Sequence, residues 1–317
     1  MENTDINQEL LEIKKELQRL KRIMNSDEKD IVEKEMSILE KRVQDIENDD
    51  YSEALALVKL SRNQKRPTTR SLCDLLLDDF VELHGDGLYS DDPSIMGGIG
   101  FLEDIPVTII GHQKGRNVHE NVYRNFGMAH PEGYRKALRL MKEAEIFGRP
   151  VITFIDTPGA YPGIEAEERG QSRAIAQNLY ALSGLKIPLV SIVIGEGGSG
   201  GALALGIADR IFMFSNATYS VISPEGCASI LWKDAGQVAK AAKHLSLSAK
   251  DQLRFKIIDK IIDEPDFEHR NIYPEFIESL KKFLIDELYI LSEKSLETLL
   301  SERYNKFRSI GMKFYFE

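Results

Sequence analysis

The amino-acid sequence predicts an α/β domain flanked by helical segments. Between Ile95 and Ile222, short apolar runs rich in β-branched residues alternate with amphipathic stretches, in the order β, β, α, β, α, β, α, β, β. Strands that alternate with helices are typical of sheets in which crossovers join parallel strands. Polar turns follow Ile110, Ile155 and Ile194, at the ends of predicted strands. Ligands collect at one end of the sheet in such folds, so these turns are the candidate functional site.

The composition is that of a globular protein and excludes several classes. The 317 residues allow one large domain or two small ones. Acidic side chains outnumber basic ones, 51 against 41, which argues against nucleic-acid binding as the main task. Cys73 and Cys227 form no C-x-x-C pair, so we expect neither a metal site nor a disulfide framework, as suits a reducing cytoplasm. The polar start of the chain and the lack of any run of about 18 apolar residues predict a cytoplasmic protein without a membrane span.

Residues 1–50 are predicted to form a helical hairpin. Apolar residues recur in steps of three and four over 6–24 and again over 32–46, on otherwise charged helices. The polar stretch 25–27 separates the two arms. Because the apolar seam is narrow, we expect the hairpin to pack on the body of the protein or on a partner subunit, outside any catalytic pocket.

A helical connector is predicted for residues 51–94. It contains a polar and basic linker over 61–69 and a short helix over 71–83. The body then spans 95–270 and begins with a hairpin. Its second strand leads into a polar loop that continues to Phe126.

Basic side chains concentrate in and after this loop, in a chain that is acidic overall. They form either a solvated helix face or a surface that meets phosphates or an acidic partner. The basic residues of the segment 114–142 are Lys114, Arg116, Arg124, Arg135, Lys136, Arg139 and Lys142.

The remaining elements of the body follow at regular intervals. The predicted helices are 131–147, 167–182 and 202–208, and the predicted strands are 151–155, 189–194, 211–214 and 219–222. From residue 231 onward the pattern is helical, and residues 271–317 form C-terminal helices that we interpret as scaffold and interface.

The most informative stretch is the glycine-rich turn 195–201, which separates a buried strand from a helix start. Five of its seven residues are glycine. The first N–H groups of a helix have no internal partner, and the helix dipole favours negative charge there. Glycines remove the Cβ atoms that would hold a ligand away from these groups. The turn is therefore predicted to present amides to an anion, or to an oxygen that becomes anionic during a reaction.

Two motifs fit this turn and lead to competing functions. Gly195, Gly197 and Gly200 match the dinucleotide fingerprint G-x-G-x-x-G, but the strand at 211–214 ends in serine and asparagine, not in the acidic residue that such a site needs. A nucleotide-binding module without catalysis is one alternative.

The other alternative is a serine hydrolase. Residues 197–201 match the nucleophile elbow G-x-S-x-G, with Ser199 as the nucleophile. A hydrolase also needs an acid and a histidine on later strands. His244 and His269 exist, but no convincing strand is predicted to carry them.

Taken together, the turns resemble those of one enzyme family, the α subunits of bacterial acetyl-CoA carboxylase carboxyltransferases. The resemblance runs from the N-terminal hairpin to about His269, where residues 266–269 depart from the family pattern and leave the role of this histidine open. The motifs are GHQKGR at 111–116, NFGMAHPEGYRKALRLM at 125–141, FIDTPGAYPG at 154–163, AEERGQS at 166–172, IGEGGSGGALALG at 194–206 and YSVISPEGCASILWK at 219–233. The resemblance implies a crotonase-like fold, a spiral of ββα units.

The resemblance also implies a reaction and its partners. The family moves a carboxyl group from carboxybiotin, on a biotin carboxyl carrier protein, to acetyl-CoA, which gives malonyl-CoA for fatty acid biosynthesis. The expected complex holds two α and two β subunits. The β subunit contributes a four-cysteine zinc site and the acetyl-CoA half of the pocket. A separate biotin carboxylase performs the ATP-dependent step.

The site residues that the resemblance implies lie on two turns. The backbone N–H groups of Gly200 and Gly201 are expected to stabilise the biotin-side oxyanion, while Gly197, Gly198 and Ser199 shape its approach. No protein nucleophile is needed. The facing wall is expected to come from Thr157, Pro158 and Gly159, for which a purely structural Pro-Gly turn is the alternative.

Overall fold

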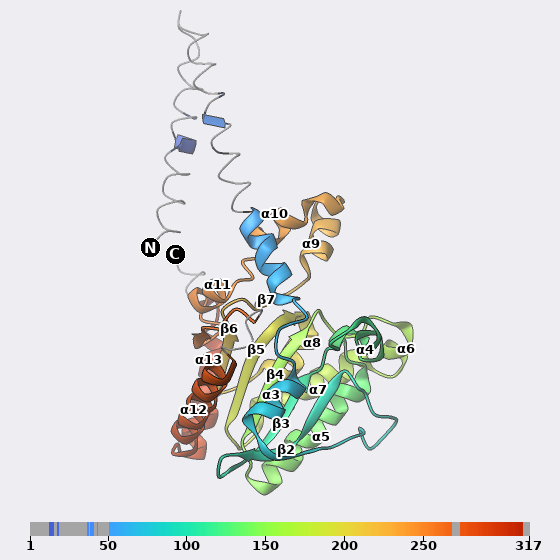
Figure 1. Ribbon diagram of the computed structural model, residues 1–317, viewed down its shortest axis with the longest axis vertical. Coiled ribbons are helices and arrows are strands. Elements are labelled where there is room, and N and C mark those ends of the chain that lie inside the picture. Colours follow the sequence, from blue (N-terminus) through green and yellow to red (C-terminus); the bar gives the residue numbers. More distant parts are fainter. Residues whose placement is uncertain are drawn as a thin grey trace, which may run out of the picture.

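The computed structural model describes residues 51–267 and 273–312, together with single positions between 13 and 43 (Figure 1). The predicted hairpin of residues 1–50 thus lies almost entirely outside the described residues, and His269 lies outside them as well.

A single sheet forms the centre of the described part of the chain. Its order is β1-β2-β3-β4-β5-β6-β8, and β7 pairs with β5. Strands β1 and β2 are antiparallel to their neighbours, and every pair from β3 onward is parallel. The strands are β1 Asp78–Glu82, β2 Ile95–Leu102, β3 Ile105–His112, β4 Val151–Thr157, β5 Leu189–Gly198, β6 Arg210–Phe214, β7 Thr218–Ser220 and β8 Lys260–Ile262.

Helices provide the crossovers that parallel strands require. The first group comprises α3 Thr69–Leu76, α4 Val118–Tyr123, α5 Pro131–Phe147, α6 Ile164–Glu168, α7 Gln171–Gly184 and α8 Ser199–Gly206. The second comprises α9 Pro224–Leu231, α10 Val238–His244, α11 Ala249–Arg254, α12 Tyr273–Ser292 and α13 Leu296–Ser309. The α/β class and the alternation of strands and helices are as the sequence predicts.

Both faces of the central strands are covered. The Ser191 hydroxyl on β5 donates to a carbonyl of α8, so this face packs on α8. The next residue on β5 is paired with Phe212 on β6, whose ring contacts Phe283 of α12. Successive strand residues point to opposite faces, so α8 and α12 lie on opposite sides of the sheet (Figure 1). This is why β4 is buried along its whole length and consists mainly of apolar residues.

Three expectations from the sequence are wrong in detail. The helix expected at 71–83 ends at Leu76, and the chain continues as strand β1, which pairs with β2. The loop expected to reach Phe126 contains helix α4, which Asn117 caps through its side chain. The C-terminal region, expected to be helical throughout, contributes β8 beside β6.

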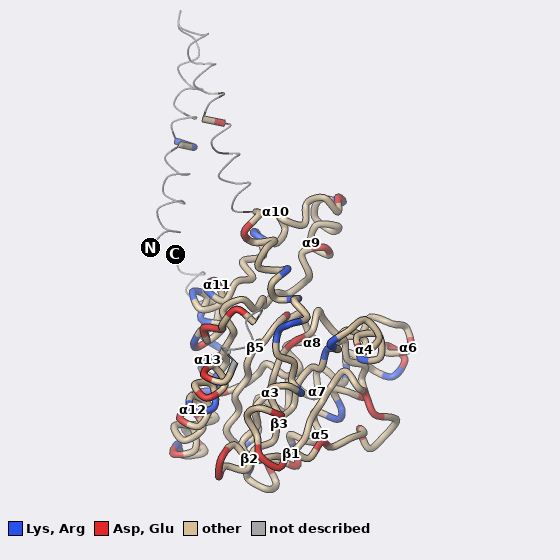
Figure 2. Tube along the Cα trace, viewed as in Figure 1, with Lys and Arg blue, Asp and Glu red and all other residues tan. Residues whose placement is uncertain are grey.

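The predicted long C-terminal helix is confirmed as α12, and α13 follows it. Lys and Arg are interspersed with Asp and Glu along both helices (Figure 2). One side chain of α13, Arg303, is buried and binds Asp209 at the start of β6. Among the described helices, none combines the length and the apolar character that a membrane crossing requires.

Candidate active site

The glycine-rich turn joins β5 to α8, but its boundaries differ from those expected. Strand β5 continues to Gly198 and α8 begins at Ser199, three residues before the expected start at Ala202. Ser199 has a φ of 51°, in the left-handed region, which makes the change from strand to helix abrupt. Within the described chain no side chain caps this helix. The first amides of α8, including those of Gly200 and Gly201, therefore stand at an uncapped helix start.

A second turn, at the end of β4, packs directly on the first. A Cβ atom on Gly198 would lie 2.1 Å from the carbonyl oxygen of Pro158. One on Gly201 would lie 2.6 Å from the backbone nitrogen of Ala160. These contacts join backbone to backbone, so only glycine fits at either position without a shift. The structure thus brings together the two turns that the sequence singles out.

The three residues of the second turn have different roles. Thr157 is fully buried, and its hydroxyl donates to the carbonyl of Gly159 at 2.7 Å and accepts from its N–H at 3.1 Å. Its side chain therefore holds the shape of the turn and does not line an open wall. Pro158 is the member of the three that lines pockets beside the glycine-rich turn.

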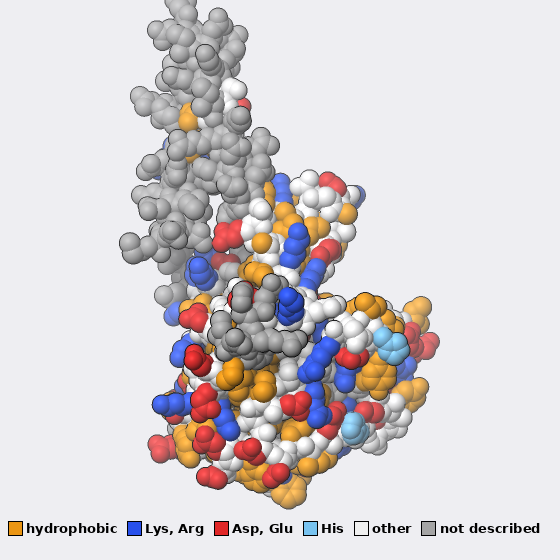
Figure 3. Space-filling model, viewed as in Figure 1, with side chains coloured by type: hydrophobic (Ala, Val, Ile, Leu, Met, Phe, Trp, Pro, Cys, Tyr) orange, Lys and Arg blue, Asp and Glu red, His pale blue; other side chains and the backbone are white. Residues whose placement is uncertain are grey.

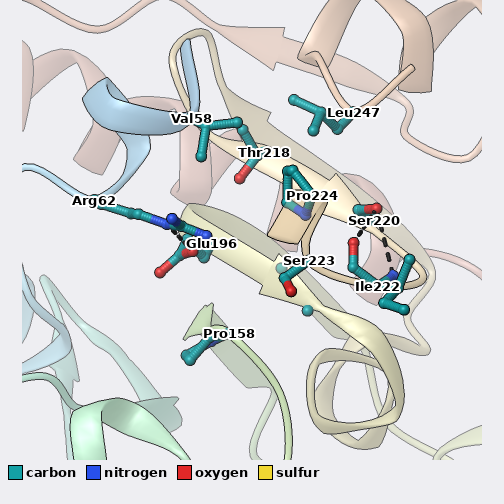
Figure 4. A pocket seen from close by; sticks show the side chains of 12 residues that line it. Val58, Arg62, Pro158, Glu196, Thr218, Ser220, Ile222, Ser223, Pro224 and Leu247 are labelled. Carbon is teal, nitrogen blue, oxygen red and sulfur yellow. Dashed lines mark hydrogen bonds and ion pairs between the residues drawn. The ribbon is translucent and has the colours of Figure 1, made fainter. Parts of the chain in front are cut away.

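Two pockets share a wall beside these turns. The larger is about 280 Å³ and lies between the segment 61–68 and the ends of β3, β4 and β5. The smaller, about 20 Å³, reaches Gly197 and Gly198 and holds no more than a water molecule (Figure 4). Figure 4 shows the side chain of Arg62 extending to Glu196, in the wall that both pockets share. Gly200 and Gly201 are not part of the lining of either pocket.

A charged cluster that sequence reasoning missed lies next to the turns. The Lys114 ammonium is 2.8 Å from a carboxylate oxygen of Asp156 and 2.7 Å from one of Glu196. Arg62 binds Glu196 at 2.6 Å and Glu225, in the first turn of α9, at 2.7 Å. Burial alone raises the pKa of Glu196, but Lys114 and Arg62 outweigh it and hold this pKa below its ordinary value. Burial alone would lower the pKa of Lys114, but the two carboxylates outweigh the effect of burial and raise this pKa above its ordinary value.

The basic segment 114–142 is largely paired within the chain. Lys136 is buried against Asp91 at 2.6 Å, and Arg135 binds Asp86 at 2.8 Å. Arg139 donates to the carbonyl of Gly85. These three of the seven basic residues tie α5 to the loop at 84–92, so they form neither a solvated helix face nor a free phosphate-binding surface.

Two polar side chains are buried behind the first turn of α8. Neither ring nitrogen of His112 has a hydrogen-bond partner among the described residues, and the Tyr134 hydroxyl has none either. A Cβ atom on Gly201 would lie 3.0 Å from the Tyr134 hydroxyl. Burial lowers the pKa of His112 to about 3, so its ring is neutral at physiological pH. It therefore provides no positive charge to the turn.

Comparison with other proteins decides among the three competing functions, a nucleotide-binding module, a serine hydrolase and a carboxyltransferase. The family described as acetyl co-enzyme A carboxylase carboxyltransferase-like matches residues 3–311. The chain belongs to the acetyl-CoA carboxylase carboxyltransferase family. It is 50% identical over 306 residues to the acetyl-coenzyme A carboxylase carboxyl transferase subunit alpha of Listeria welshimeri, which covers 96% of each chain. It is 55% identical over 255 residues to the subunit of the same name from Staphylococcus haemolyticus, covering 80% of this chain and 81% of that one.

Solved structures show the same fold at low sequence identity. A transcarboxylase 12S structure superposes with a TM-score of 0.60 at 18% identity, over 75% of this chain and 45% of that one. The β subunit of geranyl-CoA carboxylase from P. aeruginosa gives a TM-score of 0.57 at 17% identity, over 73% and 43%. The present chain thus spans somewhat less than half the length of these structures. The crotonase-like fold expected from the sequence is confirmed.

Membership of the acetyl-CoA carboxylase carboxyltransferase family excludes the interpretation of Ser199 as a hydrolase nucleophile. Its positive φ resembles a nucleophile elbow, but among the described residues no hydrogen bond joins it to a histidine. Metal ligands were not expected either, and the described residues contain no group of three or more His, Cys, Asp or Glu arranged to hold a metal ion.

Ser199→Ala provides a direct check. We expect the variant, assembled with its partner subunit, to keep its rate of carboxyl transfer within about tenfold of wild type, because the sequence predicts that backbone amides, not the Ser199 hydroxyl, stabilise the charge. If Ser199 were the nucleophile, the rate of the variant would instead fall about 10⁴-fold or more. Steady-state rates of both proteins decide between these outcomes. Ser199→Gly serves as a control for folding, since glycine relieves the left-handed backbone and should raise the melting temperature.

Proposed function

We propose that this chain is the α-type subunit of an acetyl-CoA carboxylase carboxyltransferase and that it transfers a carboxyl group to acetyl-CoA, which gives malonyl-CoA. The observation that supports this most strongly is the family match over residues 3–311. The two backbone turns that meet at Gly198 and Gly201 supply a matching geometry. Carboxybiotin supplies the carboxyl group when it is bound, and negative charge develops on its ureido oxygen.

The residues of the turn stabilise that charge through the backbone. The uncapped start of α8 directs the amides of Gly200 and Gly201 toward an incoming oxygen, and the helix dipole adds to their effect. Donors that are fixed before the reaction cost no reorganisation when charge develops. Pro158 and the buried Thr157 keep the second turn against the first, and Gly197, Gly198 and Ser199 shape the path by which the reactant approaches.

The reaction also needs a second chain in this proposal. The relatives carry the name subunit alpha, and the α subunit works with a β subunit. We infer a complex of two α and two β subunits in which the zinc-containing β subunit holds acetyl-CoA. The biotin carboxyl carrier protein and the biotin carboxylase are the other partners.

Exposed apolar side chains gather near α4 and α6, beside the second turn, and suit a subunit contact (Figure 3). They are Val118, Val122, Tyr123 and Ile164.

Dependence on the partner is the test of this assignment. Charge develops on two oxygens in this reaction, the ureido oxygen of biotin and the enolate oxygen of the acetyl-CoA thioester, and one chain supplies donors for only one of them. The purified chain is therefore expected to form malonyl-CoA at least about 100-fold more slowly than the chain mixed with its β subunit. The measurement is malonyl-CoA formed from acetyl-CoA and carboxybiotin, with each chain alone and with both. Full activity in the isolated chain would contradict the division of the site. Inactivity of the assembled complex would contradict the function itself.

A further inference from the structure

An irregularity in the pairing of β5 sets the direction of the glycine-rich turn. Strands β4 and β5 pair in regular register up to Ile155 and Val193, and pairing resumes only at Thr157 and Gly197. Asp156 alone therefore faces three residues of β5, which we call the β5 bulge, residues 194–196. Before the bulge β5 pairs with β6, and from Glu196, the last residue of the bulge, it pairs with β7. Bulges bend a strand and redirect the residues that follow, which here are the glycines of the site.

Side chains satisfy the backbone groups of the β5 bulge. The carbonyl oxygen of Ile194 accepts hydrogen bonds of 2.8 and 3.2 Å from Arg66, and the N–H of Glu196 donates to Asp156 at 2.9 Å. A Cβ atom on Gly195 would lie 2.3 Å from the same Asp156 oxygen. Buried backbone groups need partners, so the shape of the bulge depends on these side chains as well as on the pairing of Glu196 with β7.

Lys114 links this arrangement to a third strand. It follows the end of β3, and its ammonium lies 2.8 Å from the Asp156 carboxylate and 2.7 Å from the Glu196 carboxylate. One cation thus joins the ends of β3, β4 and β5. Without it, two carboxylates that are only 11% and 12% exposed would face each other, with Arg62 as the remaining cation of the cluster. Both carboxylates contact the same ammonium, so they lie close together, and like charges that are close repel strongly when they are shielded from water.

We propose that Lys114 and Asp156 are positioning residues for carboxyl transfer, which hold the β5 bulge so that the amides of Gly200 and Gly201 meet the second turn at the correct place. This inference rests on the function proposed above. Neither residue needs to touch the reactants, because each acts through the backbone of β5. A misplacement of about 1 Å at reacting atoms is enough to lower a rate about 100-fold.

The experiment compares two lysines that each form an ion pair with an aspartate. Lys114→Met removes the cation at the bulge, while Lys136→Met removes one that is more deeply buried, 1% against 17% exposed, and that pairs with Asp91, away from the bulge. Both complexes with the β subunit are assayed for kcat and for KM toward acetyl-CoA, and their amide hydrogen exchange is followed by mass spectrometry. We expect Lys114→Met to lower kcat about 100-fold with KM within about threefold, and to speed exchange over residues 195–201. Lys136→Met should keep both kcat and that exchange near wild type.

A milder variant covers the case in which Lys114→Met fails to fold. Asp156→Asn keeps an oxygen that accepts from the Glu196 N–H but loses the charge that binds Lys114, so kcat should fall about tenfold with KM unchanged. The proposal is overturned if the variants that fold keep wild-type kcat, or if kcat falls while exchange over residues 195–201 stays at the wild-type rate. If the wild-type complex itself is inactive, the proposed function fails, whereas the exchange measurement still tests the positioning of the turn.

Discussion

Gly200→Val is expected to leave the chain folded while lowering carboxyl transfer about 100-fold or more. A Cβ atom at this position would meet only Ile175 of α7, at 3.9 Å, which is an ordinary contact. We therefore expect the substitution to lower the reaction rate and not the stability, because a β-branched side chain at the start of α8 obstructs the approach to the amides of residues 200 and 201. The measurement is kcat of the assembled complex together with the melting temperature of the variant.

The neighbouring change, Gly201→Val, is expected to behave differently. From the sequence alone, both valine variants are predicted to fold normally. The structure contradicts this for Gly201, since its Cβ atom would lie 2.6 and 2.7 Å from the backbone of residues 159–160. The two turns would have to separate, so we expect a loss of stability of about 1–3 kcal/mol in addition to the loss of activity.

A matched control for the pair is Gly184→Val. This glycine ends α7, and apart from its chain neighbours and the backbone of its own helix no described atom lies within 4 Å of the position that its Cβ would take. It should change neither stability nor kcat appreciably. If Gly200→Val retained near-normal turnover, the amides of this turn would not be the oxyanion donors. If Gly201→Val melted at the wild-type temperature, the close packing of the two turns would be wrong.

The elements that the sequence predicts well are those with a local pattern. Strands such as β4 consist mainly of apolar residues between glycine or proline turns, and the three candidate turns do meet at one end of the sheet. Strand β1 was missed because its sequence, DDFVE, is short and acidic, and it is held at the sheet edge by pairing with β2. Strand β8 has three residues and depends on β6 in the same way. Tertiary pairing decides such segments, not intrinsic preference.

The charged cluster could not be predicted for a related reason. Lys114 and Glu196 are 82 positions apart in the sequence, and Arg62 lies 134 positions from Glu196. Their contact follows from the register of three parallel strands and from the bulge, neither of which a local pattern encodes. The presence of Asp156 and Glu196 within the two glycine-rich motifs was the signal that could have drawn attention to them.

Arg303→Met is expected to destabilise the chain by about 3–5 kcal/mol, because it removes one partner of a buried ion pair. The guanidinium binds both carboxylate oxygens of Asp209, each at 2.8 Å. It also donates to carbonyls at the end of α7 and in the loop that follows, so all five of its N–H groups are used. These acceptors are the carbonyl oxygens of Leu182, Leu185 and Ile187, at 2.9, 2.7 and 3.0 Å.

The same variant tests whether the pair of Arg303 and Asp209 anchors α13 to the sheet. Asp209 also accepts from the N–H of Leu189, the first residue of β5, so the loss of Arg303 leaves a charge buried beside the strand that carries the site. Arg303→Lys should recover little, since a lysine cannot reproduce the planar fork. The neighbouring change Glu302→Gln, at an exposed pair with Lys294, should cost less than about 0.5 kcal/mol. Urea unfolding of the three variants is the measurement, and a cost below about 1 kcal/mol for Arg303→Met would show that α13 is not anchored by this pair.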